Sequence, residues 1–139
     1  MFSITTDSYI DPTEVNPYIV KVKVNYHNEL FKERIEKLAK ERHLGLIVFK
    51  DIFDGLFGLR RINTVISSLF WCERWKPIIV TPLSDLNDKE FKFASNREST
   101  IFCKSVRIEL ERFLGEQQKK FEHLVNLRRD QPGGFQGKS

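Results

Sequence analysis

Glu90 and Lys92 place a carboxylate and an ammonium group two residues apart in a short predicted strand. In metal-dependent nucleases such a pair flanks the scissile phosphate, while a second acidic residue helps to hold the metal. Asp85 is the nearest upstream carboxylate but lies in a short turn, and Asp51 and Asp54 follow a different strand. The spacing therefore favours an edge strand with solvated charges, and a metal-dependent nuclease is the least favoured hypothesis.

Two glycine-containing segments could contact phosphate groups. Gly137–Ser139 matches the end of a phosphate-binding loop, but Pro132 stands where the first glycine is required and no helix follows. Gly55–Gly58 resembles the GxxG loop with which KH domains clamp a nucleic-acid backbone, although its middle residues are apolar and a strand precedes it. A plain strand-to-helix connection is preferred. Its apolar residues are either tucked under the next helix or exposed for a partner: Phe53, Leu56 and Phe57.

The residue types that usually bind metals or act as nucleophiles are not grouped in the sequence. His27, His43 and His123 are far apart, and Cys72 and Cys103 belong to no CxxC pair or Cys/His cluster. No nucleophile motif such as GxSxG is present. We therefore expect no metal and no cofactor, and a non-enzymatic role is favoured over catalysis.

The basic residues could instead form a surface that binds nucleic acid. The net charge is +4, and residues 96–139 hold nine basic and six acidic side chains. Glutamates interrupt the cations, so a solvated amphipathic helix is preferred over a dedicated phosphate-binding surface. The candidate nucleic-acid-binding residues are Arg60, Arg61, Lys104, Arg107, Lys119, Lys120, Arg128 and Arg129.

Length and composition predict one globular domain. The chain has 139 residues, of which 40% are hydrophobic and 30% charged, and it contains twelve phenylalanines. No apolar run is long enough to cross a membrane, and no secretory signal pattern is evident at the start. We expect an intracellular, cytoplasmic protein with no membrane contact, whose phenylalanines lie in the core or at an interface.

Hydrophobic periodicity predicts alternating strands and helices up to residue 95. Residues 1–17 read as an irregular arm with a short strand at Phe2–Thr6, because each of two X-Pro steps disfavours a helix before it. A half-buried strand (Tyr18–Tyr26) precedes a helix capped by Asn28. The remaining predictions are a strand at Leu44–Phe49, a helix at Ile62–Trp75, and strands at Ile78–Val80 and Glu90–Phe93. This order predicts an α/β or α+β fold with crossover units, a small mixed sheet of three to five strands and about three helices.

A long helix at about 97–127 closes the domain (residues 1–127), and residues 128–139 form a flexible tail. Its apolar stripe has heptad-compatible spacing, and at about 45 Å the helix is longer than a compact domain of this size. Phe113, Phe121 and Leu124 are the predicted partner-binding residues. The leading hypothesis is a binding or adaptor protein that uses this helix for self-association or for a protein partner, with a nucleic-acid context as an option. Direct nucleic-acid binding is the alternative. Removal of residues 116–139 is expected to leave a folded domain that no longer associates.

Overall fold

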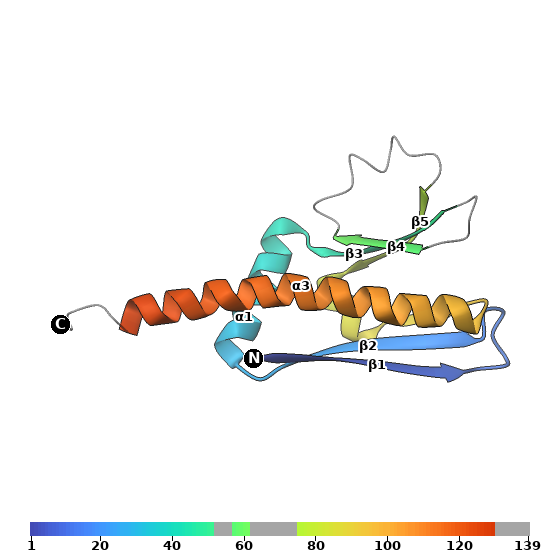
Figure 1. Ribbon diagram of the computed structural model, residues 1–139, viewed down its shortest axis with the longest axis horizontal. Coiled ribbons are helices and arrows are strands. Elements are labelled where there is room, and N and C mark those ends of the chain that lie inside the picture. Colours follow the sequence, from blue (N-terminus) through green and yellow to red (C-terminus); the bar gives the residue numbers. More distant parts are fainter. Residues whose placement is uncertain (52–56, 62–74, 130–139) are drawn as a thin grey trace.

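The computed structural model describes residues 1–51, 57–61 and 75–129. Within this part of the chain, two three-stranded sheets pack with one long helix, α3 (Asn96–Arg129) (Figure 1). The predicted α/β or α+β class is confirmed. The strands form two separate sheets with six strands in total among the described residues, instead of one mixed sheet of three to five.

The first sheet has the order β1–β2–β6, with β1 at Phe2–Ile10, β2 at Tyr18–Tyr26 and β6 at Glu90–Phe93. The prediction for β2 is confirmed at both ends, because its strict alternation is a local signal. The predicted short strand at Phe2–Thr6 is present but runs on to Ile10, so the irregular segment is confined to residues 11–17 instead of filling the rest of the N-terminal arm. β1 pairs with β2 along its whole length, from Phe2 opposite Tyr26 to Ile10 opposite Tyr18, and this pairing overrides its weak, polar pattern.

The second sheet has the order β4–β3–β5, with β3 at Gly45–Asp51, β4 at Phe57–Arg61 and β5 at Trp75–Pro82. All strand pairs among the described residues are antiparallel, so the prediction of crossover units is wrong. The predicted buried strand is confirmed in β3, which is buried nearly throughout and lies centrally between its two neighbours. The predicted helix at Ile62–Trp75, apart from Trp75 in β5, and the loop residues Phe53 and Leu56 lie outside the described residues.

Two short elements connect the sheets. Helix α1 (Glu29–Arg42) begins where the Asn28 side chain accepts a hydrogen bond from the Phe31 backbone N–H, and it ends at His43 in the left-handed conformation with φ of 50°. The 3₁₀ helix η1 (Leu83–Asp88) leads from β5 into β6. Both termini of α1 therefore follow the predicted signals.

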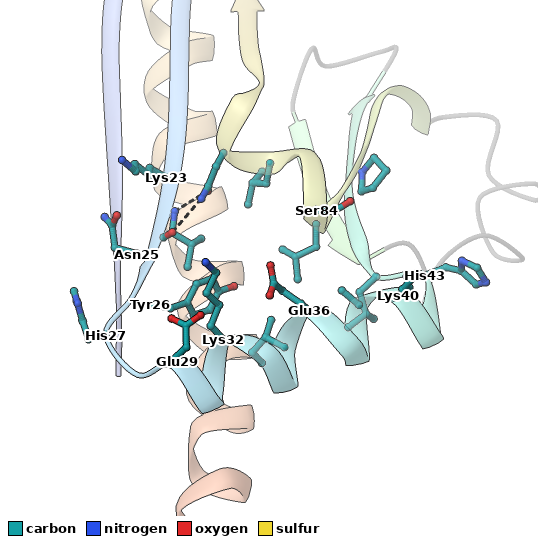
Figure 2. Close-up of a pocket in the computed structure, with 18 residues that line it drawn as sticks. Lys23, Asn25, Tyr26, His27, Glu29, Lys32, Glu36, Lys40, His43 and Ser84 are labelled. Carbon is teal, nitrogen blue, oxygen red and sulfur yellow. Dashed lines mark hydrogen bonds between the residues drawn. The ribbon is translucent and has the colours of Figure 1, made fainter.

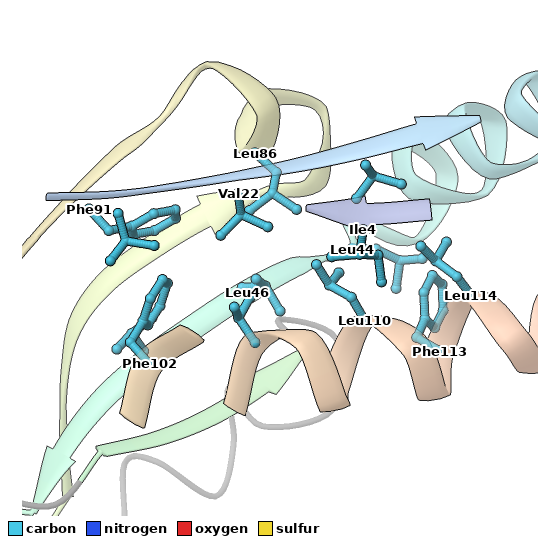
Figure 3. Packing of buried hydrophobic residues seen from close by; sticks show 14 of the residues in the cluster. Ile4, Val22, Leu44, Leu46, Leu86, Phe91, Phe102, Leu110, Phe113 and Leu114 are labelled. Carbon is cyan, nitrogen blue, oxygen red and sulfur yellow. The ribbon is translucent and has the colours of Figure 1, made fainter. Parts of the chain in front are cut away.

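The core lies between α3 and the facing sides of the two sheets (Figure 3). Val22 and Phe91 face it from the first sheet, Leu46 from the second, and Phe102 and Leu110 from α3. The Phe102 ring lies 4.7 Å from that of Phe91, which is within the range of favourable aromatic pairs. The phenylalanines that the sequence left unassigned are largely core residues. Those that the structure shows as buried are Phe31, Phe49, Phe91, Phe93, Phe102 and Phe113.

Candidate functional site at the end of helix α3

The C-terminal end of α3 extends beyond the body of the domain. The helix has 34 residues and is therefore about 51 Å long. Figure 1 shows its last turns running past α1 and past both sheets. The last contact between α3 and α1 that involves aromatic rings joins Phe121 to Phe31, with centroids 5.6 Å apart in an edge-to-face arrangement. Residues 122–129 form the projecting end.

The apolar stripe of α3 passes from the core into solvent at this end. Leu110, Gln117 and Leu124 are spaced by seven residues, which places them on one face of the helix. Their exposed fractions are 2% for Leu110, 6% for Gln117 and 43% for Leu124. Leu127, one turn further along, is 50% exposed. The cover supplied by the sheets and α1 thus ends between Gln117 and Leu124, while the apolar pattern continues.

The three residues predicted to bind a partner occupy different environments. Phe113 is a buried member of the core, and Phe121 is partly buried against it. Leu124 is about half exposed on the projecting end. Of the three residues only Leu124 is classed as exposed, so the apolar surface at this end of α3 is formed by Leu124 and by Leu127, which sequence reasoning did not single out. We call these two residues and the helix around them, 122–129, the distal surface.

Charges of both signs surround the distal surface. Lys119, Lys120 and Glu122 are exposed, and the Gln118 amide donates a hydrogen bond of 2.9 Å to the Glu122 carboxylate. The other predicted cations are spread along the chain. Lys104 lies fifteen residues before Lys119, or about 22 Å along the axis, and Arg107 donates a hydrogen bond of 3.0 Å to the Thr6 hydroxyl.

The four remaining basic candidates lie at element ends. Arg60 and Arg61 are the last residues of β4, and Arg128 and Arg129 are the last of α3, two residues further than the helix was predicted to run. The structure therefore groups four of the eight predicted cations, Lys119, Lys120, Arg128 and Arg129, within the last three turns of α3.

The Glu90 and Lys92 pair is part of the outer surface of the first sheet. Phe91 and Phe93 alternate with them into the core, so the two-residue spacing follows from the pleat of β6. Glu90 accepts a hydrogen bond from the Tyr9 hydroxyl, which lowers the pKa of the carboxyl group. Lys92 forms an ion pair of 2.9 Å with Glu14, and that hydrogen bond raises its pKa. Both charges are therefore engaged in surface pairs.

The acidic residues considered as partners of Glu90 are elsewhere. Asp51 is fully buried at the end of β3, in the other sheet, and Asp85 is exposed on η1. Asp54 lies outside the described residues. Within residues 1–51, 57–61 and 75–129, no group of three or more His, Cys, Asp or Glu side chains is arranged to hold a metal ion. The described residues thus supply no metal-centred arrangement around Glu90.

A cavity between β2, α1 and η1 is the feature that sequence reasoning missed. Its volume is about 1050 Å³, and its walls come from segments up to 64 residues apart in the chain. Asn87 closes one edge of the cavity. Its role cannot be recognised in the sequence, because its side chain hydrogen-bonds to the backbone of Val24 in β2, a strand far away in the chain.

Two further findings concern membrane spans and similarity to known proteins. No helix in the described part of the chain is both long and apolar enough to cross a membrane. The chain matches no protein-family model, no curated protein and no solved structure.

Proposed function

We propose that this chain is a non-enzymatic association protein, in which the distal surface of α3 binds the same surface of a second copy. The observation that carries the proposal is the continuation of the apolar stripe beyond its cover, from Gln117 at 6% exposure to Leu124 at 43%. A helix face of this kind is stabilised by a second helix packed along it.

A second copy is favoured because the distal end carries both signs of charge. In a twofold arrangement each surface meets itself, so a patch must be complementary to its own image. Antiparallel pairing that sets Leu124 of one copy opposite Leu127 of the other would place Glu122 of each copy opposite Arg129 of the other. A surface with one sign of charge would repel its own copy instead.

The expected affinity is low. Complete burial of a leucine side chain contributes about 1.5–3 kcal/mol, and Leu124 and Leu127 are already half covered. Four such side chains in a dimer would contribute about 3–6 kcal/mol, and the loss of translational and rotational freedom reduces this gain. We therefore expect a weak, transient dimer with a dissociation constant in the millimolar range.

Sedimentation equilibrium from 20 µM to 1 mM tests the proposal. The average mass of the wild-type chain should rise with concentration, and the double variant Leu124→Gln/Leu127→Gln should stay monomeric. Ile108→Gln is the matched control, because Ile108 is 67% exposed on the same helix but lies outside the distal surface. A wild-type chain that is monomeric at 1 mM, or equal association of all three proteins, would refute self-association through this surface.

A truncation that tests the distal surface must leave the core contacts of α3 intact. Removal of residues 116–139 would delete buried Gln117 and the Phe121 ring that covers Phe31, so loss of association could simply reflect damage to the core. A chain ending at Glu122 keeps both contacts and removes Leu124, Leu127 and the residues that follow them. It should remain folded and monomeric.

Direct nucleic-acid binding is the alternative role for the same end of α3, since Lys119 and Lys120 precede Arg128 and Arg129 within three turns. Fluorescence anisotropy with labelled DNA and RNA over a salt series distinguishes the two roles. Binding through about four phosphate contacts would weaken roughly 100-fold or less between 50 and 200 mM salt, with a slope near the number of cations involved. Self-association without such binding would favour the protein role.

A further inference from the structure

A cavity of about 1050 Å³ lies between the edge of β2, the inner face of α1 and η1 (Figure 2). This volume is at the upper end of the range of small-molecule sites in proteins. Apolar residues from all three elements, and Leu44 just after α1, line much of it: Val24, Ile35, Ala39, Leu44, Leu83 and Leu86. A ligand with an apolar body would therefore find a surface on which to pack.

The cavity exists because β2 loses its neighbour halfway along. β6 pairs with β2 only from Tyr18 to Lys21, and the chain before β6 is folded into η1 instead of continuing as a strand. At Val24 the Asn87 side chain takes the place of the missing strand. It accepts a hydrogen bond of 2.9 Å from the Val24 N–H and donates one of 3.1 Å to the Val24 carbonyl.

These two hydrogen bonds fix the direction of the neighbouring backbone groups. In an antiparallel strand, residues two apart direct their N–H and C=O groups to the same side. The Val24 backbone groups point toward Asn87, and the His27 N–H points the opposite way and donates to the Met1 carbonyl beside β1. The Tyr26 backbone therefore faces the cavity. Asn87 blocks the edge at Val24, so the site has room for a small molecule but not for an added peptide strand.

Many of the residues that line the cavity are polar, among them Tyr26, Lys32 and Glu36. Figure 2 shows Tyr26, Lys32 and Glu36 pointing into the space between β2, α1 and η1, while Lys23 and His27 point away on the other side of β2. Among the described residues, the side chains of Lys32 and Glu36 take part in no ion pair of 4.0 Å or less, although one turn of α1 separates them. Glu29 and Lys40 also line the cavity, so its walls carry charges of both signs. Lys32 and Glu36 do not neutralise each other by direct contact.

The Tyr26 hydroxyl adds a hydrogen-bond donor. Burial is the main cause that raises the pKa of Tyr26 to about 12, and the negative charge of Glu36 raises it further. The hydroxyl consequently stays protonated at neutral pH and can donate to an anionic group. Glu36 would repel a purely anionic ligand, and Lys32 would repel a purely cationic one. A molecule with one positive and one negative group can pair with both side chains.

We propose that this cavity binds a small zwitterion with an apolar side chain, of the α-amino-acid type. Its carboxylate lies at Lys32 and the Tyr26 hydroxyl, its ammonium group lies at Glu36, and its side chain packs on Ile35 and Leu86. The site is independent of the distal surface of α3, and its occupancy does not require a second copy of the chain.

Titration of the ¹⁵N-labelled protein with L-phenylalanine and L-leucine, followed by amide chemical shifts, tests the proposal. Backbone signals of β2 around Tyr26 and of α1 should move and saturate in the millimolar range or below. 3-Phenylpropionate, which lacks the ammonium group, and phenylalaninamide, which lacks the carboxylate, should each bind at least about 10-fold more weakly, since each loses one charge-assisted hydrogen bond.

Substitutions of Lys32 and Glu36 test which side chain binds the carboxylate of the ligand and which binds its ammonium group. Lys32→Met and Glu36→Gln should each weaken binding of the amino acids by about 10-fold or more. Lys32→Met should not weaken phenylalaninamide, which has no carboxylate to lose. The matched controls are Lys37→Met and Glu33→Gln, at exposed positions of the same helix. Amide signals that stay unmoved at 10 mM of both amino acids would overturn the proposal. Binding that is equally strong in both cavity variants and both controls would do the same.

Discussion

Replacement of Asn87 by alanine isolates the contribution of one side chain to the edge of β2. The substitution removes the hydrogen bonds of 2.9 and 3.1 Å to the N–H and carbonyl of Val24, a residue that is 4% exposed. Each neutral hydrogen bond contributes about 0.5–1.5 kcal/mol net. The free energy of unfolding should therefore fall by about 1–3 kcal/mol. The lower half of this range applies if water enters the cavity and replaces the amide, because Asn87 itself is exposed.

Urea denaturation followed by circular dichroism measures this difference from the midpoint at constant slope. Asn87→Asp serves as a second variant. Its carboxylate can still accept from the Val24 N–H, but when ionised it cannot donate to the Val24 carbonyl, so it should recover only part of the loss. A change below about 0.3 kcal/mol in Asn87→Ala would refute the argument that Asn87 replaces the missing strand.

Asn87→Ala also leaves the backbone groups of Val24 at the edge of β2 without their partner. Unpaired backbone groups on an edge strand are a template for pairing with another chain. Asn87→Ala should therefore associate more readily than the wild type at equal concentration, through β2 and not through α3. This association should persist when the distal surface is removed by ending the chain at Glu122. If Asn87→Ala no longer associates when its chain ends at Glu122, the association runs through α3 and not through β2.

Three further predictions concern the core, the helix end and the outer sheet surface. Phe102→Ala should lower the free energy of unfolding by about 3–5 kcal/mol in urea denaturation, since the fully buried ring packs on two other phenylalanines. Phe121→Ala should cost about 1–3 kcal/mol in the same assay, whereas Leu124→Ala should cost under about 0.5 kcal/mol, because only Phe121 contacts the core. In NMR titrations, Tyr9→Phe should raise the pKa of Glu90 toward 4.5, since the Tyr9 hydroxyl is the main cause of its lowering. The stabilisation from this pair is present above the unfolded pKa and is lost as pH falls through the lower folded pKa; a Glu90 pKa unchanged in Tyr9→Phe would contradict the assignment.

The sequence determined those elements whose signals are local. The alternation of β2 and the cap at Asn28 are properties of consecutive residues, and both appear in the structure at the predicted positions. The apolar spacing of α3 likewise predicted one long helix. The general fold class followed from these elements, because strands and helices of this size must pack their apolar faces together.

The pairing of strands was decided only by the tertiary structure. β1 has a weak pattern of its own, and its nine residues become a strand because β2 provides a complete set of backbone partners. The order of strands and helices suggested parallel crossovers, yet β3 pairs antiparallel with β4 and β5. A strand pattern shows which face is apolar but does not identify the neighbouring strand.

Exposure along α3 also depended on tertiary contacts. Leu110 and Leu124 have the same residue type and the same place in the seven-residue spacing, but one is in the core and the other is at the surface. The difference arises from where the sheets and α1 end. The cavity has the same origin, since Asn87 acts on Val24 from 63 residues away. Periodicity describes the face of an element, whereas cover and cavities depend on which distant segments reach that face.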